Sequence, residues 1–284
     1  MVSGEGKLIT SDRFETPRST AGLLDRITGR IAALEAPSDP AALVGVALPG
    51  PVDRARGVLV RSVNLPFLQD IPIEDELAKR VSKKVVLMTD AEAATWGEYL
   101  ACDSPVERFI HLRFGTGVAC GVVARGDLQP TDADRRTHLP ALVVDDRPDA
   151  PACICGLRGC LELFAGGEAI ARHPIEEVAG WIVRGIGNLV DPPPYGRGSE
   201  DRVAAGSPFE KQHRVASAPR SDGGGDLTVV CLGGGVLAAF PALFDRVCEQ
   251  WLVRQRGGRA KAELRPSRLG DDAGVVGAAL LVGR

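Results

Sequence analysis

The stretch VVLMTDAEAATWGEYL, residues 85–100, places an apolar strand directly before a helix. VVLM is a continuous apolar run of the kind found in strands that are buried on both faces, and residues 91–100 predict the helix. The strand ends at Thr89 and Asp90. A carboxylate at the carboxyl end of a strand in an α/β sheet could act as general base on a substrate hydroxyl, and it could equally be the N-cap of the helix. Position alone leaves both interpretations of Asp90 open.

Strands and helices alternate on both sides of this stretch. We expect helices at 20–36, 74–81, 175–189 and 236–253 and from residue 271, and strands at 43–48, 109–114, 118–124 and 227–232. Gly115-Thr116-Gly117 joins two of the strands and predicts a hairpin. This alternation indicates an α/β fold around a buried sheet. Residues 191–226 interrupt it, because they are rich in Pro, Gly, Ser and charge; they predict a mobile insertion, as a surface loop in preference to a functional lid.

The composition is that of an ordinary soluble globular protein, with 44% hydrophobic residues, 25% charged residues and a net charge of −3. Lys and Arg are spread along the chain, so nothing indicates a face for nucleic acid. The sequence has no apolar run long enough for a membrane span, and its N-terminus is polar where a signal peptide needs an apolar segment. We therefore expect a cytoplasmic protein with no nucleic-acid or membrane partner.

Three cysteines lie close together in CICGLRGC, residues 153–160. In a reducing cytosol, clustered cysteines favour metal or redox chemistry over a structural disulfide. Cys153, Cys155 and Cys160 supply three soft ligands, and the glycines between them allow the backbone to turn so that the sulfurs converge. The nearest candidate for a fourth ligand is His138, which would complete a closed zinc site of the structural type. The alternative is a set of buried or redox-active thiols without metal.

Glycine clusters follow two of the expected strands, at Gly115-Thr116-Gly117 and at Gly233-Gly234-Gly235. Backbone N–H groups in such clusters could approach phosphate oxygens or a nucleotide ring. Each cluster alone is a weak signal because glycine turns after strands are common. Two in one α/β chain favour a nucleotide-binding hypothesis.

Several segments, taken in order, resemble the ROK family of sugar kinases and sugar-responsive repressors. They are VGVALPGPVD (44–53), VNLPFLQDIPI (63–73), TDAEAATWGE (89–98), FGTGVACGVVARGDL (114–128), CICGLRGCLELFAGGEAI (153–170), VVCLGGGV (229–236) and LGDDAGVVGAALL (269–281). The resemblance implies an α/β protein with the two-lobed, actin-like ATPase (ribonuclease H-like) fold. The smaller lobe would be residues 1–105, completed by the C-terminal helix at 271–284, and the larger lobe residues 106–270.

The resemblance also implies a function. The chain would be a glucokinase-like enzyme that transfers the γ-phosphoryl group of ATP to a hexose or modified hexose, with Asp90 as general base and Mg²⁺ at the phosphates. The implied contacts are the sugar on Gly50, Asn64, His138 and Glu162, the phosphates on Gly115, Thr116 and Gly117, and the adenosine on Gly233, Gly234 and Gly235. Zinc would be structural, and the protein would be a homodimer.

The sequence departs from the family pattern at several positions. The family's Asp-x-Gly-Gly-Thr phosphate loop precedes the strand that MVSGEGKL resembles, so we expect that the chain lacks this loop or that Met1 is not the true start. Thr89 stands where an asparagine is usual, Glu92 follows Asp90 by two residues, and Arg135 replaces a glutamate that binds sugar. These departures keep a second hypothesis open, a catalytically degenerate protein that binds or senses a sugar.

Overall fold

The structure is a computed structural model of the chain. It describes residues 1–34, 43–62, 64–104, 106–129, 142–191, 227–257 and 261–282. The chain divides into two compact units, the first formed by Met1–Leu100 with Asp272–Arg284 and the second by Ala101–Asp271. No helix among the described residues is both long enough and apolar enough to cross a membrane.

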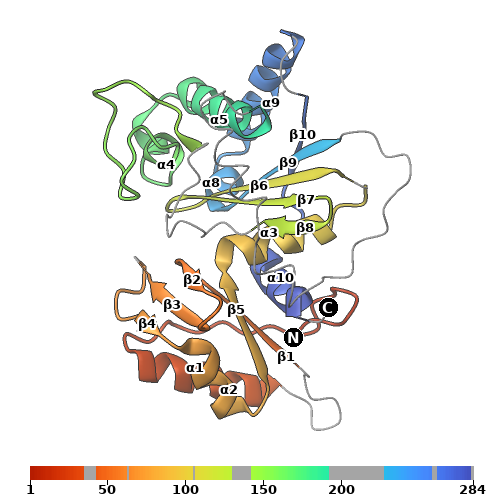
Figure 1. The fold of residues 1–284 in the computed structure, drawn as a ribbon. Helices are drawn as coiled ribbons and strands as arrows, with labels where there is room; N and C mark the ends of the chain where they lie inside the picture. Colours follow the sequence, from red (N-terminus) through yellow and green to blue (C-terminus); the bar gives the residue numbers. More distant parts are fainter. Residues whose placement is uncertain are drawn as a thin grey trace. The chain divides into compact units, whose positions relative to one another are not determined.

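The described residues of the first unit form a parallel strand pair, a small antiparallel sheet and four helices (Figure 1). Strand β1 (Leu43–Leu48) pairs with β5 (Lys84–Thr89) in a register that sets Leu48 opposite Thr89. The antiparallel sheet consists of β2 (Val52–Asp53), β3 (Val58–Arg61) and β4 (Gln69–Ile71). The helices are α1 (Thr20–Leu34), α2 (Ile73–Val81), α3 (Asp90–Leu100) and α10 (Ala273–Val282). The helix and strand predicted at residues 85–100 are confirmed.

Helices α3 and α10 pack with their backbones in close contact. A Cβ added to Gly277 of α10 would lie 1.7 Å from the carbonyl oxygen of Ala93 in α3. Glycine is therefore required where these helices meet, because any side chain would push them apart. A separate apolar core in this unit joins β1, β5 and the small sheet to α1 and α2. It includes Leu23, Leu24, Val46, Leu48, Leu59, Leu77, Val85 and Leu87.

The second unit is built on a five-stranded sheet in the order β10-β9-β6-β7-β8. Strands β6 (Arg108–Phe114) and β7 (Val118–Ala124) form the predicted hairpin, and β8 (Asp127–Gln129) extends it. Strands β9 (Thr228–Gly233) and β10 (Glu263–Pro266) run parallel to β6. The helices are α4 (Glu162–Ala165), α5 (Ile175–Val190), α8 (Gly235–Ala239) and α9 (Pro241–Arg256), with short 3₁₀ turns at Ile170–Arg172 and Gly270–Asp272.

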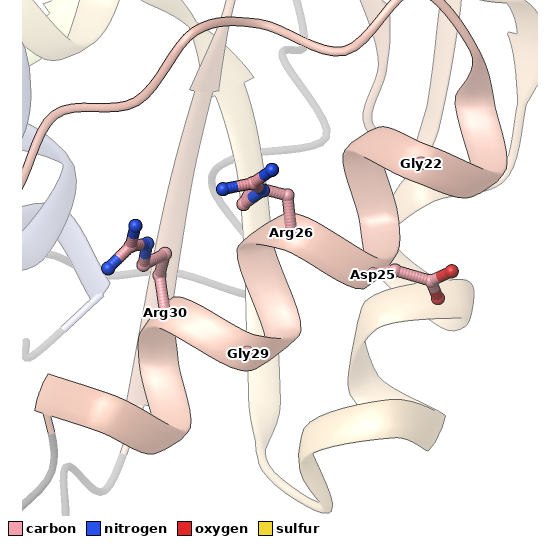
Figure 2. Close-up of a pocket in the computed structure, with 5 residues that line it drawn as sticks. All are labelled: Gly22, Asp25, Arg26, Gly29 and Arg30. Atoms are coloured by element: carbon pink, nitrogen blue, oxygen red, sulfur yellow. The ribbon is translucent and has the colours of Figure 1, made fainter.

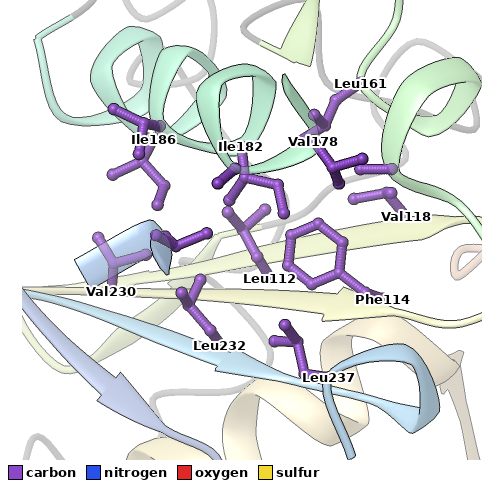
Figure 3. Close-up of a cluster of buried hydrophobic side chains, with 14 of the residues drawn as sticks. Leu112, Phe114, Val118, Leu161, Val178, Ile182, Ile186, Val230, Leu232 and Leu237 are labelled. Atoms are coloured by element: carbon purple, nitrogen blue, oxygen red, sulfur yellow. The ribbon is translucent and has the colours of Figure 1, made fainter. Parts of the chain in front are cut away.

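Apolar side chains of the sheet and of α5 form the core of the second unit. Figure 3 shows Val178, Ile182 and Ile186 of α5 facing Leu112 and Phe114 of β6. Ile182 and Ile186 recur at helical spacing, and both are fully buried. Each such side chain contributes about 1.5–3 kcal/mol by leaving water.

The prediction of one continuous helix at 236–253 is wrong. The segment forms two helices, α8 and α9, that meet at Phe240 and Pro241. Pro241 occupies the first turn of α9. Proline has no N–H to donate to the preceding turn, so it ends one helix and begins the next.

Candidate functional site

Asp90 lies at the carboxyl end of β5, as the first residue of α3, and is partly exposed. The N-cap of the helix is Thr89: the Glu92 N–H donates to Thr89 Oγ1 at 3.1 Å, and the Thr89 N–H donates to Glu92 Oε2 at 3.0 Å. This reciprocal pair is a capping box. The Oδ1 atom of Asp90 accepts the N–H of the adjacent Ala91 at 2.9 Å. The reciprocal capping pair is thus formed by Thr89 and Glu92, and the Asp90 carboxylate is not part of it.

Glu92 also forms an ion pair with Arg54, which lies in the turn between β2 and β3. The Glu92 side chain is 0% exposed and that of Arg54 is 22% exposed. Sequence reasoning missed this pair, since the two residues are far apart in the chain. The spacing of Thr89 and Glu92 is the sequence signature of a capping box, and it could have identified Glu92 but not its partner Arg54.

Gly50 and Asn64 belong to the same unit as Asp90. Because β1 and β5 are parallel and end together at Leu48 and Thr89, Gly50 and Asp90 both follow strands that reach the same edge. Gly50 is partly buried. Asn64 is exposed in the segment after β3.

The two glycine clusters lie together in the second unit. Strands β6 and β9 are parallel, with Arg113 opposite Gly233, so both clusters follow strands at the same edge of the sheet. Their backbones approach closely, because a Cβ added to Gly234 would lie 2.2 Å from the carbonyl oxygen of Phe114. Gly234 also has a φ of +98°, a conformation that favours glycine.

Glu162 contacts the first of these clusters. Its Oε2 atom accepts the Val118 N–H at 3.1 Å, and a Cβ added to Gly117 would lie 2.0 Å from the same oxygen. The Gly167 N–H donates to the Gly115 carbonyl at 2.7 Å, which fixes the segment after α4 against the turn. The structure therefore brings together a predicted sugar contact and the predicted phosphate turn.

The three clustered cysteines have their sulfur atoms within 4.8 Å of one another. Gly156 and Gly159, at φ values of +88° and +65°, provide the sharp turns between them. Burial raises the pKa of the Cys153 and Cys160 thiols. A bound cation would reverse this shift, because thiolates are the ligands that zinc binds, at about 2.3 Å. Sulfurs on a tetrahedral zinc are therefore about 3.8 Å apart, and the sulfurs of Cys155 and Cys160 lie 3.5 Å apart in this cluster.

His138, the proposed fourth ligand, and Arg135 lie outside the described residues. So does the segment 191–226, apart from Asp191. Three sulfurs are therefore the part of the predicted zinc site that the structure describes.

Two surface hollows lie elsewhere. One, of about 420 Å³, is lined by a single helix, α1. In Figure 2, Arg26 and Arg30 extend from one side of this helix and Asp25 from another. These side chains contact neighbours, with Arg30 2.8 Å from Asp12 and Arg26 over the ring of Phe14. The second hollow, of about 320 Å³, is lined by Asp145, Asp146, Arg147, Trp181 and Arg184.

Comparison with solved structures identifies the class of fold. The ROK hexokinase of Thermus thermophilus superposes with a TM-score of 0.70 and 26% identity, covering 95% of this chain and 88% of the hexokinase chain. A ROK family glucokinase of Streptomyces griseus, in complex with glucose and AMPPNP, gives a TM-score of 0.63 at 23% identity, covering 99% and 94%. The chain has the actin-like, ribonuclease H-like fold of these sugar kinases.

Sequence comparison identifies the family. The glucokinase of Thermotoga maritima is 30% identical over 297 residues, covering 99% of this chain and 92% of the glucokinase. An N-acetylmannosamine kinase of Escherichia coli O1:K1 is 27% identical, with the same coverage of each. The model of the ROK family matches residues 1–192, and the chain belongs to that family.

Proposed function

We propose that the chain is a sugar kinase that transfers the γ-phosphoryl group of ATP to a hydroxyl of a hexose or modified hexose, with Asp90 as general base. The hydroxyl oxygen forms a bond to the γ-phosphorus, the bond to the bridging oxygen breaks, and ADP leaves. The proton of the hydroxyl passes to the Asp90 carboxylate. The observation that carries the proposal is the position of Asp90 at the end of β5, in a helix that Thr89 and Glu92 cap without it.

The remaining residues have distinct proposed roles. Gly50, Asn64, His138 and Glu162 bind the sugar. Gly115, Thr116 and Gly117 face the phosphates, and Gly233, Gly234 and Gly235 face the adenosine. Mg²⁺ neutralises charge on the phosphate oxygens when it is bound. The two compact units are the proposed lobes, and the proposed protein is a cytoplasmic homodimer.

We also propose that Cys153, Cys155 and Cys160, with His138, bind a structural zinc ion. The convergence of the three sulfurs within 4.8 Å supports this assignment. A closed site of four protein ligands has no open position for a water nucleophile, so its role is to fix the loop. That loop leads directly into Glu162, so zinc would hold a sugar contact in place.

A sugar-binding protein without turnover is the second candidate, and one observation favours it. The Thr89 hydroxyl, at the position where the family has an asparagine, accepts the Glu92 N–H and belongs to a residue that is only 6% exposed. One of the two lone pairs of this hydroxyl is therefore used within the protein. A sugar pocket that lacks this contact loses about 0.5–1.5 kcal/mol for one neutral hydrogen bond.

The test is ATP turnover in the presence of a panel of hexoses and amino sugars. We expect at least one sugar to stimulate ADP release, and Asp90→Asn to lower kcat by about 100-fold or more, because general-base catalysis contributes about 10²–10⁴-fold. Asp75→Asn is the matched control, since Asp75 is an exposed aspartate in the first turn of α2. It should leave kcat unchanged.

The same panel separates the two candidates. Thermal stabilisation by a sugar without ADP release from any of them would support the binding protein and contradict the kinase. Full activity of Asp90→Asn would remove Asp90 from the role of general base.

A further inference from the structure

Arg54 and Glu92 form a charged pair that the proposed reaction does not use. Glu92 is the least exposed charged side chain among the described residues, at 0%, and Arg54 is 22% exposed. A carboxylate removed from water in this way is costly unless a cation and hydrogen bonds compensate it. The ion pair with Arg54 therefore compensates part of the cost of burying the Glu92 carboxylate.

A single carboxylate oxygen makes two different connections. The Oε2 atom of Glu92 forms the ion pair with Arg54 and also accepts the Thr89 N–H at 3.0 Å. It thus joins the turn between β2 and β3 to the last residue of β5. The Glu92 N–H returns a bond to Thr89 Oγ1 at 3.1 Å, so the backbone on both sides of Asp90 is held by the same two residues.

The arrangement leaves little freedom to the residue in between. Asp90 is joined covalently to Thr89, whose N–H and hydroxyl are both bound to Glu92. If Glu92 shifts, the peptide that carries the Asp90 side chain shifts with it. A displacement of about 1 Å at a reacting group can cost about 100-fold in rate.

We propose that Arg54 and Glu92 are positioning residues for Asp90, a role that rests on the proposed function of Asp90 as general base. Arg54 keeps the buried Glu92 carboxylate in the capping box, and the capping box holds the Asp90 carboxylate in the orientation that receives the proton. Neither residue touches the reacting atoms. A glutamine at position 92 could form the capping box but not the ion pair with Arg54. The charge of Glu92 is therefore what connects the turn between β2 and β3 to this site.

Arg54→Met tests this role, since methionine preserves much of the side-chain length and removes the charge. We expect kcat to fall by about 10- to 100-fold, as for a misplaced reacting group. The KM for the sugar should stay within about threefold of wild type, because an interaction realised only in the transition state lowers kcat without raising KM.

The double variant Arg54→Met/Glu92→Gln provides the rescue. Glutamine can keep both bonds to Thr89 and leaves no unpaired buried charge, so kcat should return to within about threefold of wild type, as expected for strongly coupled neighbours. Arg56→Met is the matched control. Arg56 lies in the same turn, is 56% exposed and pairs with Asp53 instead, and its variant should keep wild-type kcat.

Hydrogen exchange of the peptide covering residues 86–96 gives a readout that does not depend on turnover. Arg54→Met should exchange faster there than wild type, and the double variant should be restored. Unchanged exchange and kcat in Arg54→Met would overturn the positioning role, as would a loss of kcat that the double variant does not restore. Absence of sugar-dependent turnover in wild type, with the expected exchange pattern, would overturn the proposed kinase activity and leave the effect of the pair on this turn established.

Discussion

Asp145 forms a two-point ion pair with Arg147. The Arg147 guanidinium donates to both carboxylate oxygens, with Nε 2.9 Å from Oδ1 and Nη2 2.7 Å from Oδ2. These side-chain hydrogen bonds hold the pKa of Asp145 down, at about 2. Asp145 is 7% exposed and precedes the cysteine loop, where its N–H donates to the Gly159 carbonyl at 3.2 Å.

A lowered pKa makes the contribution of Asp145 dependent on pH. Wild type should be more stable than Arg147→Met at pH 7, and the difference in Tm should disappear as the pH falls from about 4, the pKa of an unfolded aspartate, toward 2. Thermal melts at pH 7, 4 and 2.5 measure this. Arg125→Met, which removes an exposed pair with Glu107, should match wild type throughout. A Tm gap of equal size at pH 7 and 2.5 would contradict the assignment.

Some candidate site residues could be proposed from the sequence and others could not, for a physical reason. Asp90 could be proposed because the strand and the helix that flank it are continuous in sequence. The Arg54–Glu92 pair depends on how the turn after β2 packs on the end of β5, which no local pattern encodes. The roles assigned to Asp90, Gly50, Asn64 and His138 come from family resemblance and stay predictions.

At the scale of an element, the cysteine loop is held by a few backbone bonds. The Cys153 N–H donates to the Leu157 carbonyl at 2.8 Å, and the Val144 N–H donates to the Gly159 carbonyl at 2.8 Å. Such a short loop has little apolar surface of its own to bury. Ile154, between two of the cysteines, is 68% exposed. The proposed metal would therefore add to the stability of this loop.

Removal of one sulfur tests the proposed zinc site. We expect wild type to retain about one zinc ion and Cys155→Ser to bind it at least about 10-fold more weakly, since even partners outside the ligand shell are worth about 10–100-fold. Metal analysis after dialysis against a chelator measures the retained zinc. Cys248→Ser, a partly exposed thiol on α9, is the control and should keep its metal. Full zinc retention in Cys155→Ser would refute the assignment.

Helices and strands with a clear periodic pattern or turn in the sequence were predicted well. Short strands that depend on pairing with another strand were not. The helices at α1, α2 and α5 and the hairpin of β6 and β7 follow from periodicity and a glycine turn, and the structure confirms them. The short strands β2, β3, β4 and β10 were missed, because strands of two to four residues carry almost no periodic signal. These short strands are stabilised by pairing with neighbouring strands in the sheet.

At the scale of the whole molecule, the first unit is assembled from both ends of the sequence. Helix α10 packs on α3, the helix that begins at Asp90, although the entire second unit separates them in the chain. Each unit has its own apolar core. We therefore expect the two units to unfold as distinguishable transitions.

Gly277→Val tests the dependence of the first unit on α10. The added side chain would clash with the Ala93 carbonyl, and overpacking of this kind costs about 1–3 kcal/mol. In a background where Trp96 of α3 is the remaining tryptophan, the urea midpoint reported by that tryptophan should shift to a lower concentration. In a background that keeps only Trp251 of α9, the midpoint should not shift. Gly274→Ala, whose Cβ would meet nothing within 4 Å, is the control. Equal shifts in both backgrounds would contradict independent units.

The return of α10 to the first unit also has a consequence for biosynthesis. On the ribosome, α3 emerges early, but the surface around Ala93 and Gly97 that receives α10 has no partner until every residue of Ala101–Asp271 has been translated. The nascent chain must therefore carry an incomplete first unit while the second unit is synthesised. Apolar surface that stays exposed in this way is the kind that chaperones protect. The helix that carries Asp90 is thus among the first to be synthesised and among the last to be completed.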